Sequence, residues 1–280
     1  MRRAARLRPL LPFGPLRTLF RAWLAARSAG PDARESTREL LLAYDDVYRR
    51  LDEAAARYDD GVHVKHRLMR YHDFFVERVR PQEHVLDVGC GKGELAHDLV
   101  VRGGATVVGI DSDPRHLAFA RSRFVHERLE FVAGDVTETL PAGHFDVVVL
   151  SNVLEHLEAR VALLEQVVGS ADPARLLVRV PLLTRDWTVP LRRELGLPYF
   201  WNDDHKVEYE PASLRAELGE AGLAVTELTV NWGEIWAAAH RDGGGAAPPA
   251  FAGRARAGMP ASGHRRGRAP GRLREAAPPA

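Results

Sequence analysis

An apolar segment that breaks abruptly into alternating glycines is the feature that most constrains the fold of this chain. The segment reads Val85-Leu86-Asp87-Val88-Gly89-Cys90-Gly91-Lys92-Gly93-Glu94-Leu95. It predicts a buried strand that turns directly into a helix, because glycines permit unusual backbone conformations and leave room for a close approach. A dinucleotide fingerprint would need a small residue at position 94, where this chain has Glu94. The loop therefore indicates a ligand site and disfavours a nicotinamide dehydrogenase.

Strand-like and helix-like segments alternate from residue 85 onward. The strands are expected at Val85–Val88, Thr106–Ile110, Leu129–Val132, Phe145–Leu150, Leu176–Val180, Ala224–Val230 and Ile235–Ala239. The helices are expected between them, at Gly93–Arg102, Pro114–Phe124, Val153–Gly169 and Pro211–Ala221. This alternation predicts an α/β fold with a doubly wound, mostly parallel sheet. The last two strands are joined only by residues 231–233, too few for a helical crossover, so this pair must be antiparallel.

Acidic or polar residues stand at the ends of the first four expected strands. They are Asp87 before the glycine loop, Asp111 and Ser112 after the second strand, Asp135 after the third (with the apolar Val136 next to it), and Asn152 after the fourth. Any one of these acids alone could cap a helix or occupy a turn. Helix capping does not explain why four consecutive strands each end in a residue that is suited to binding a ligand.

Taken together, these residues resemble the motifs of class I S-adenosylmethionine-dependent methyltransferases, over about residues 80–240. The resemblance implies a Rossmann-like sheet of seven strands with an antiparallel last strand. It implies S-adenosylmethionine as methyl donor and S-adenosylhomocysteine as product. The implied contacts are Asp87, Gly89, Gly91 and Gly93 for the methionine end, Asp111 and Ser112 for the ribose, Asp135 and Val136 for the adenine, and Asn152 beneath the sulfonium. Cys90, between two glycines, is expected to be a small residue that fits the loop and not a nucleophile.

Two places offer a group that could remove a proton from the methyl acceptor. The first is Asn152-Val153-Leu154-Glu155-His156. It is similar to the Glu-x-x-Glu-His run of ubiquinone-type O-methyltransferases, which can hold a divalent metal. Here Asn152 replaces the first glutamate, and we predict no metal. His156 is a candidate base or substrate-fixing residue, or else Glu155 and His156 merely stabilise the start of a helix.

The second place is the long connection from residue 181 to residue 210, inside the expected methyltransferase domain of residues 81–240. It carries Trp187, Tyr199, Phe200, Trp201, Asp203, Asp204, His205, Glu208 and Tyr209. Connections of this length commonly build a lid or a pocket, although the aromatic residues could instead form a small core of their own. His205, next to Asp204, is the preferred candidate for a catalytic base.

The flanking segments differ from this domain in composition. Residues 1–30 are basic, and one helical face carries Leu16, Leu19, Phe20, Trp23 and Leu24. That face docks on the rest of the chain or on a second subunit, or residues 15–28 lie at a membrane surface; an arginine-rich transit peptide is a third reading. Residues 31–80 are expected to form a helical cap. Residues 241–280, rich in Gly, Ala, Pro and Arg, are expected to be disordered.

The resemblance to this family implies an enzyme that methylates a small-molecule or lipid- or sugar-linked acceptor at oxygen. The charge is nearly balanced, with 39 basic and 38 acidic side chains, and does not indicate a nucleic-acid binder. The single cysteine and the lack of a membrane-spanning run favour a cytoplasmic location, peripheral to the membrane if residues 15–28 bind lipid. The alternatives are an RNA or DNA methyltransferase with basic terminal arms, and a non-catalytic scaffold. The Asn-Pro-Pro-Tyr signature of amino-group methylases is absent after strand four, and the intact glycine loop argues against a scaffold.

Overall fold

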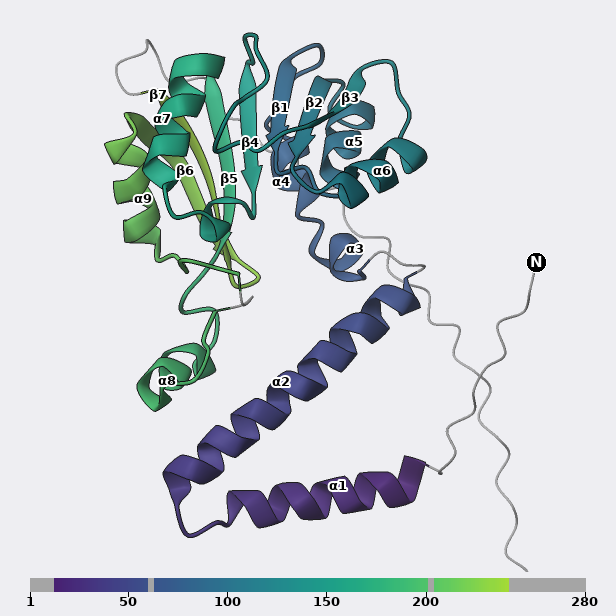
Figure 1. Cartoon of the computed structure of the whole chain (residues 1–280), viewed down its shortest axis with the longest axis vertical. Coiled ribbons are helices and arrows are strands. Elements are labelled where there is room, and N and C mark those ends of the chain that lie inside the picture. The colour runs from purple at the N-terminus through teal and green to yellow at the C-terminus, as the bar shows by residue number, and fades with distance from the viewer. Residues whose placement is uncertain (1–12, 60–62, 201–203, 242–280) are drawn as a thin grey trace, which may run out of the picture. The chain divides into compact units, whose positions relative to one another are not determined.

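The computed structural model describes residues 13–59, 63–200 and 204–241, which include a seven-stranded sheet flanked by helices (Figure 1). The strand order is β3-β2-β1-β4-β5-β7-β6. The strands are β1 (His84–Val88), β2 (Thr106–Asp111), β3 (Leu129–Ala133), β4 (Val147–Ser151), β5 (Arg175–Pro181), β6 (Leu223–Asn231) and β7 (Glu234–Arg241). Strands β1 to β5 pair in parallel, and β7 is antiparallel to both β5 and β6. The predicted fold class is confirmed.

Helices pack on both faces of this sheet. On one face, α7 (Arg160–Ala171) and α9 (Pro211–Glu220) bury leucines against Leu86 and Leu150. On the other face, α4 (His72–Val76), α5 (Glu94–Val101) and α6 (Pro114–Arg123) pack against Val147 and Leu177. Side chains of a strand alternate between faces, so strands covered on both faces need apolar residues throughout. This requirement explains the uninterrupted apolar run of β4.

One expected helix is wrong in its first half. The apolar spacing predicted a helix over Val153–Gly169, but the structure has a 3₁₀ turn at Leu154–His156 and begins α7 at Arg160. The backbone N–H groups of Lys206 and Val207 donate to the carbonyl of Glu155, at 2.7 and 3.4 Å. This distant segment takes up the carbonyl that an α-helix would use for its own i+4 amide. Glu155 and His156 therefore project from a tight turn.

The N-terminal region is helical, as expected, but more divided. It comprises α1 (Phe13–Ser28), α2 (Ala33–Tyr58), α3 (Lys65–Met69) and the α4 helix that packs on the sheet. Arg70, with a φ of 50°, separates α3 from α4, where one continuous helical run was expected. Helix α1 pairs with α2 through Arg27 and Glu39 at 3.1 Å. Its apolar face is left open, since Leu19 is 68% exposed, so the proposed docking or membrane contact stays a prediction. Residues 1–12 and 242–280, for which the sequence predicts a basic segment and a disordered tail, lie outside the described ranges.

The connection from residue 181 to residue 210 leaves the sheet and returns to its own start. Leu182 bridges Tyr209, and the N–H of Leu183 donates to the Tyr209 carbonyl at 2.7 Å. Between these ends, α8 (Thr188–Leu195) contacts α2, where Arg192 donates to both carboxylate oxygens of Asp45 at 2.7 and 2.9 Å. The closed ends hold residues 204–210 against the turn that follows β4. None of the helices in the described ranges has the length and hydropathy to cross a bilayer.

Candidate functional site

The candidate site lies at the carboxyl ends of the central strands, where the strand order reverses beside β1. In open α/β sheets this switch point is where ligands bind, because the loops after neighbouring strands diverge there. Backbone bonds tie the loops of this edge together: the N–H of Cys90 donates to the Ile110 carbonyl at 3.0 Å, and that of Gly134 to the Asp111 carbonyl at 3.2 Å. The loops after β1, β2 and β3 therefore form one continuous surface.

The three glycines of the first loop adopt positive φ for different reasons. A Cβ on Gly89 would lie 2.7 Å from a methyl of Val153, and a Cβ on Gly93 would lie 2.6 Å from the ring of Phe131. These two glycines allow the loop to pack tightly on the domain. Gly91, with a φ of 55°, has no atom within 4 Å of the same position. Its open side is where a ligand can reach the backbone, which fits the methyl donor that the sequence motifs imply.

This difference yields a matched pair of variants. Gly91→Ala is expected to reduce S-adenosylmethionine affinity at least tenfold while lowering the free energy of unfolding by only about 1–2 kcal/mol, the strain of a left-handed alanine. Gly93→Ala adds a steric conflict with Phe131 and is expected to cost clearly more stability. Denaturant unfolding and calorimetry measure the two effects separately. Equal destabilisation by both variants, or unchanged affinity in Gly91→Ala, would contradict this assignment.

Asp111 both shapes the loop and stands at the expected ribose position. Its Oδ2 accepts from the N–H of Gly91 at 2.8 Å, and its Oδ1 accepts from the N–H of Asp113 at 2.8 Å. His116 Nδ1 lies 3.4 Å from Oδ1. Each carboxylate oxygen has two lone-pair sites, so these bonds leave capacity to accept from two ribose hydroxyls. Asp111 thus connects the glycine loop to the end of β2.

Asp87 is a buried carboxyl with an unmet hydrogen-bonding need. It is 2% exposed, and its Oδ2 has no hydrogen-bond partner within the described parts of the chain. Burial, reinforced by the nearby Asp111 charge, raises the pKa of Asp87 to about 7. A cation at this edge would favour the ionised form. S-adenosylmethionine carries both an ammonium and a sulfonium, so the orphaned carboxyl fits that ligand.

The remaining residues expected to bind the cofactor differ in their exposure and in the hydrogen bonds that they already make. Ser112 and Asp135 are exposed, and Val136 is partly buried against the core. Asp135 Oδ1 accepts from the N–H and the hydroxyl of Thr137, at 2.9 and 2.7 Å. These bonds hold the pKa of Asp135 below its ordinary value. Its second oxygen remains available for the adenine contact, which stays a prediction.

The side chain of Asn152 already makes hydrogen bonds within the protein, which the sequence did not predict. Its amide nitrogen donates to Glu155 Oε1 at 2.7 Å, and its Oδ1 accepts from the guanidinium of Arg179. Arg179, at the end of β5, is 7% exposed and stacks 3.8 Å above the ring centre of Tyr71. Asn152 therefore links the turn after β4 to β5, and its direct contact with the donor stays a prediction.

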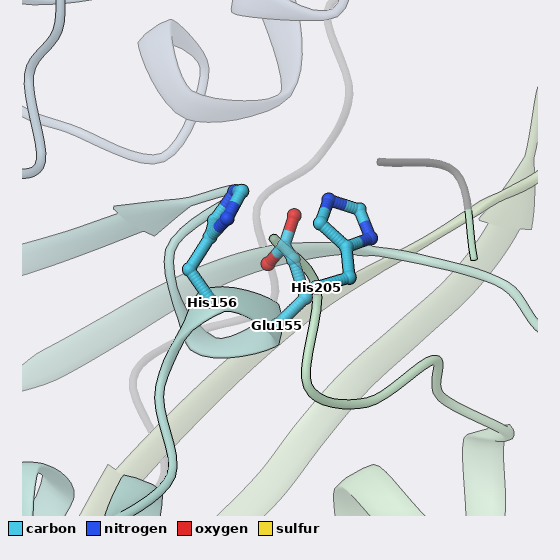
Figure 2. Close-up of side chains that lie close together, drawn as sticks. All are labelled: Glu155, His156 and His205. Atoms are coloured by element: carbon cyan, nitrogen blue, oxygen red, sulfur yellow. The ribbon is translucent and has the colours of Figure 1, made fainter. Parts of the chain in front are cut away.

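Glu155, His156 and His205 come together at this edge from two distant segments (Figure 2). One ligand-competent atom of each residue lies within 4.8 Å of the others, and the two imidazole centres are 4.7 Å apart with near-perpendicular rings. Glu155 is fully buried, and its Oε2 has no hydrogen-bond partner within the described parts of the chain. We call these three residues the Glu-His-His cluster. The sequence singled out both histidines but did not predict that they meet.

Each imidazole of the Glu-His-His cluster is oriented by a carboxylate. His156 Nδ1 lies 3.0 Å from Asp204 Oδ2, and His205 Nδ1 lies 3.3 Å from Glu208 Oε1. An ionised carboxylate only accepts, so each Nδ1 carries the hydrogen in these contacts and each Nε2 keeps its lone pair. Glu208 is itself buried and paired with Arg185. The insertion thus delivers an imidazole of defined tautomer to the end of β4.

Burial sets the electrostatics of the Glu-His-His cluster. It raises the pKa of Glu155 to about 7, against the lowering effect of the Asn152 hydrogen bond. It also lowers the pKa of His156, against the opposing effect of Asp204. Both shifts favour neutral side chains in the ligand-free chain. Two neighbouring side chains with shifted pKa values, Glu155 and His156, are typical of functional centres.

The other insertion residues named in the sequence analysis lie outside the Glu-His-His cluster. Trp187 is 75% exposed, and Tyr209 is buried with its hydroxyl donating to Glu217 at 2.5 Å. Neither position is that of an apolar pocket wall. Trp201 and Asp203 lie outside the described residues. Cys90 is buried, which raises the pKa of its thiol and agrees with a packing role.

Arg179 is the site residue that the sequence reasoning missed, and Glu208 was named in the insertion without its contact to His205 being predicted. Arg179 interrupts the apolar run of a strand that is buried over its whole length. A charged residue near the carboxyl end of such a strand is a usable signal, because burying it needs a specific partner. Glu208 gave no comparable signal, since its contact with His205 depends on how the insertion folds.

The chain is similar in sequence to known methyltransferases. Residues 85–173 match a family model described as a methyltransferase domain. A ubiquinone biosynthesis O-methyltransferase of Azorhizobium caulinodans is 30% identical over 176 residues, which cover 59% of this chain and 69% of that protein. A ribosomal protein L11 methyltransferase of Burkholderia multivorans is 36% identical over 121 residues, which cover 42% of this chain and only 39% of that protein.

Solved structures share the fold at low sequence identity. One is a protein in complex with the Trm112 methyltransferase activator of Haloferax volcanii, with a TM-score of 0.54 and 18% identity, covering 68% of this chain and 97% of that chain. Another is an O-methyltransferase of neocarzinostatin biosynthesis, solved with S-adenosyl-L-homocysteine and 1,4-dihydroxy-2-naphthoic acid. Its TM-score is 0.51 at 22% identity, covering 71% of this chain and 61% of that chain. At these identities the likeness establishes the architecture.

Proposed function

Since this chain belongs to the class I S-adenosylmethionine-dependent methyltransferases, we propose that it methylates an oxygen atom of a small-molecule acceptor, either free or carried on a lipid or sugar. The observation that supports this most is the Glu-His-His cluster at the carboxyl edge of β4. One relative, the ubiquinone biosynthesis enzyme of Azorhizobium caulinodans, is an O-methyltransferase by name. That name is consistent with an oxygen acceptor here.

Methyl transfer to a hydroxyl needs positioning and the loss of one proton. The acceptor oxygen attacks the methyl carbon, an O–CH₃ bond forms, the C–S bond breaks, and S-adenosylhomocysteine leaves with the electron pair. The hydroxyl proton must leave at the same time. His205 Nε2 and Glu155 Oε2 are suited to promote this loss, because His205 Nδ1 faces Glu208 and Glu155 Oε2 has no hydrogen-bond partner among the residues that the structure describes. A cluster of proton-accepting groups favours a hydroxyl acceptor over one that needs no deprotonation.

The chain's own residues would hold the donor as follows. The Gly89–Gly93 loop offers backbone N–H groups at the start of α5, which suit the methionine carboxylate. Asp87 offers a negative charge near the cationic end, and Asp111 offers acceptors for the ribose hydroxyls. Arg179 and Asn152 brace the turn that carries Glu155. In this arrangement the donor and the Glu-His-His cluster share one edge of the sheet.

A methyl-transfer screen tests the proposal. The native chain is incubated with donor labelled in its methyl group and with three acceptor pools: hydroxylated aromatic small molecules and lipids, total RNA, and purified ribosomal proteins. We expect label to enter the small-molecule or lipid fraction, with release of S-adenosylhomocysteine. Transfer only to RNA or only to ribosomal protein would contradict the proposal. The ribosomal protein pool is included because one relative is a ribosomal protein L11 methyltransferase. The match covers only 39% of that relative, so its substrate is not assigned to this chain.

A further inference from the structure

Helix α1 carries an apolar face that is exposed within the described parts of the chain. Four residues recur there at helical spacing and are between 41 and 68% exposed: Leu16, Leu19, Phe20 and Trp23. We propose that this face docks α1 onto the surface of a lipid bilayer that contains anionic lipid. The inference goes beyond the proposed function, because lipid binding requires neither a methyl donor nor an acceptor.

The sparse packing of α1 is the first argument. Every residue from Gly14 to Ser28 except Leu24 is exposed, and Arg27 pairs with Glu39 of α2 at 3.1 Å. None of the hydrophobic clusters formed by the described residues includes a side chain of α1. A helix of 16 residues is marginal in water on its own, because most helical stability comes from burying an apolar face. A surface that covers this face would therefore stabilise the helix.

The kind of residue on the apolar face is the second argument. The rings of Phe20 and Trp23 stack, with centres 6.1 Å apart and an interplanar angle of 11°. Aromatic residues and leucine on one face of a basic helix are typical of helices that lie in the plane of a membrane interface. At 1.5 Å per residue α1 is about 24 Å long, shorter than the hydrocarbon core of about 30 Å. The helix would therefore lie on a bilayer and not cross it.

The charge of the chain is the third argument, and it indicates which surface α1 fits. Residues 1–30 contain seven arginines and no acid, whereas residues 31–241 carry 36 acidic and 25 basic side chains. Arg17 and Arg21 of α1 form no ion pair with the residues that the structure describes. An anionic bilayer attracts basic side chains and repels acidic ones. It would therefore orient the protein with α1 on the lipid.

Two other occupants of this face fit the charge less well. The α1 helices of two copies, laid side by side, would bring only cationic side chains together, because α1 contains no acid. Residues 242–280 carry seven arginines and two acids, so this segment does not complement α1 either. The charge thus favours lipid over the chain's own basic tail and over self-pairing of α1.

Co-sedimentation with vesicles tests the proposal. The full chain is mixed with phosphatidylcholine vesicles, with and without phosphatidylglycerol, and the bound fraction is measured against lipid concentration. We expect phosphatidylglycerol to strengthen binding at least tenfold, and added salt to weaken it. The double variant Phe20→Ala and Trp23→Ala is expected to bind at least tenfold more weakly. The double variant Arg17→Gln and Arg21→Gln is expected to lose as much.

Matched controls come from α2. Leu51 and Tyr58 are 62 and 79% exposed, so replacing both with alanine removes an apolar pair that is more exposed than the one on α1. Arg49→Gln with Arg57→Gln removes two exposed arginines. Both control variants should bind the vesicles with native affinity, because α2 carries acidic side chains along its whole length.

A fluorescent label reports which side of α1 enters the lipid. The sole cysteine, Cys90, is buried, so a thiol-reactive dye can be directed to an introduced cysteine. Leu16→Cys places the dye on the apolar face, and Ala25→Cys places it on the opposite side of the helix, given 3.6 residues per turn. On vesicles we expect a blue shift from the dye at position 16 and little change at position 25. Equal responses from both positions would overturn docking through the apolar face.

The remaining outcomes are equally decisive. No binding to phosphatidylglycerol vesicles by the native chain, or equal affinities of the α1 and α2 variants, overturns the proposal. Sedimentation equilibrium without lipid shows whether a second copy covers the face. A dimer that the Phe20 and Trp23 variant breaks, and that does not bind vesicles, overturns the assignment to lipid. Unfolding curves and S-adenosylmethionine calorimetry show that the variants are folded, and no readout depends on methyl transfer.

Discussion

Asp111→Ala is expected to weaken S-adenosylmethionine binding by about tenfold to a thousandfold. The carboxylate is placed to accept from the ribose hydroxyls, and each hydrogen bond to a charged group contributes about 1.5–3 kcal/mol. The same side chain accepts from the N–H of Gly91 at 2.8 Å, so its removal also releases the glycine loop. Both effects act on the donor site. Isothermal calorimetry of native and variant chains measures the change.

Asp113→Asn is the matched control for this variant. Asp113 caps α6 by accepting from the N–H of Arg115 at 2.7 Å, and asparagine caps helices about as well as aspartate. The control changes a neighbouring acid without altering the proposed ribose contact, so its affinity for the donor should match that of the native chain. Equal losses in both variants would mean that general damage to the β2–α6 loop, and not the Asp111 carboxylate, weakens binding.

His205→Ala is expected to lower kcat by about 10²–10⁴-fold while leaving donor affinity within a factor of about two. This range is the usual effect of removing a group that assists proton loss. His205 belongs to the Glu-His-His cluster, whereas the donor contacts assigned above lie on the loops after β1, β2 and β3. A loss confined to kcat therefore places His205 with the acceptor. Rate measurements with the acceptor found in the screen, alongside donor calorimetry, provide the test.

Two control variants test whether the loss of kcat in His205→Ala comes from removal of the imidazole. His144→Ala removes an exposed imidazole outside the cluster and should retain native kcat. His205→Gln keeps a polar side chain in the buried position, where His205 is 6% exposed, and reports whether the effect of alanine comes from a cavity. An unchanged kcat in His205→Ala, or a parallel loss of donor affinity, would remove His205 from the acceptor side.

The glycine loop and the sheet could be predicted from the sequence because their signals are local. A buried strand covered on both faces must be apolar throughout, and positive φ values favour glycine, so Val85–Gly93 reveals its structure directly. Asp87 and Asp111 follow from the same rule, since parallel strands end at one edge. The hairpin of β6 and β7 followed from the short turn at residues 231–233.

The turn after β4 could not be predicted because distant residues shape it. The apolar spacing from Val153 onward fits a helix, yet Lys206 donates to the carbonyl of Glu155 at 2.7 Å. Asn152 also takes a φ of 58° and binds Arg179 across the sheet. These interactions join segments separated by dozens of residues. Helical periodicity reports only neighbours within the same segment.

The meeting of His156 and His205 was hidden for the same reason. Each histidine was a separate candidate in the sequence, one after β4 and one in the insertion. The two histidines lie close together because the bridge between Leu182 and Tyr209 closes the insertion. The same closure brings the carboxylates of Asp204 and Glu208 into contact with the two imidazoles.

A co-crystal structure with S-adenosylhomocysteine tests the central claim most directly, which is that donor and Glu-His-His cluster share one edge of the sheet. We predict the methionine end against Gly91, the ribose on Asp111, and the sulfur facing the side where Glu155, His156 and His205 meet. The contradicting result is a ligand whose sulfur points away from this cluster. A ligand bound in the cavity of about 560 Å³ lined by His66, Glu94, His97 and Asp98, without contact to Gly91 or Asp111, would contradict the claim equally.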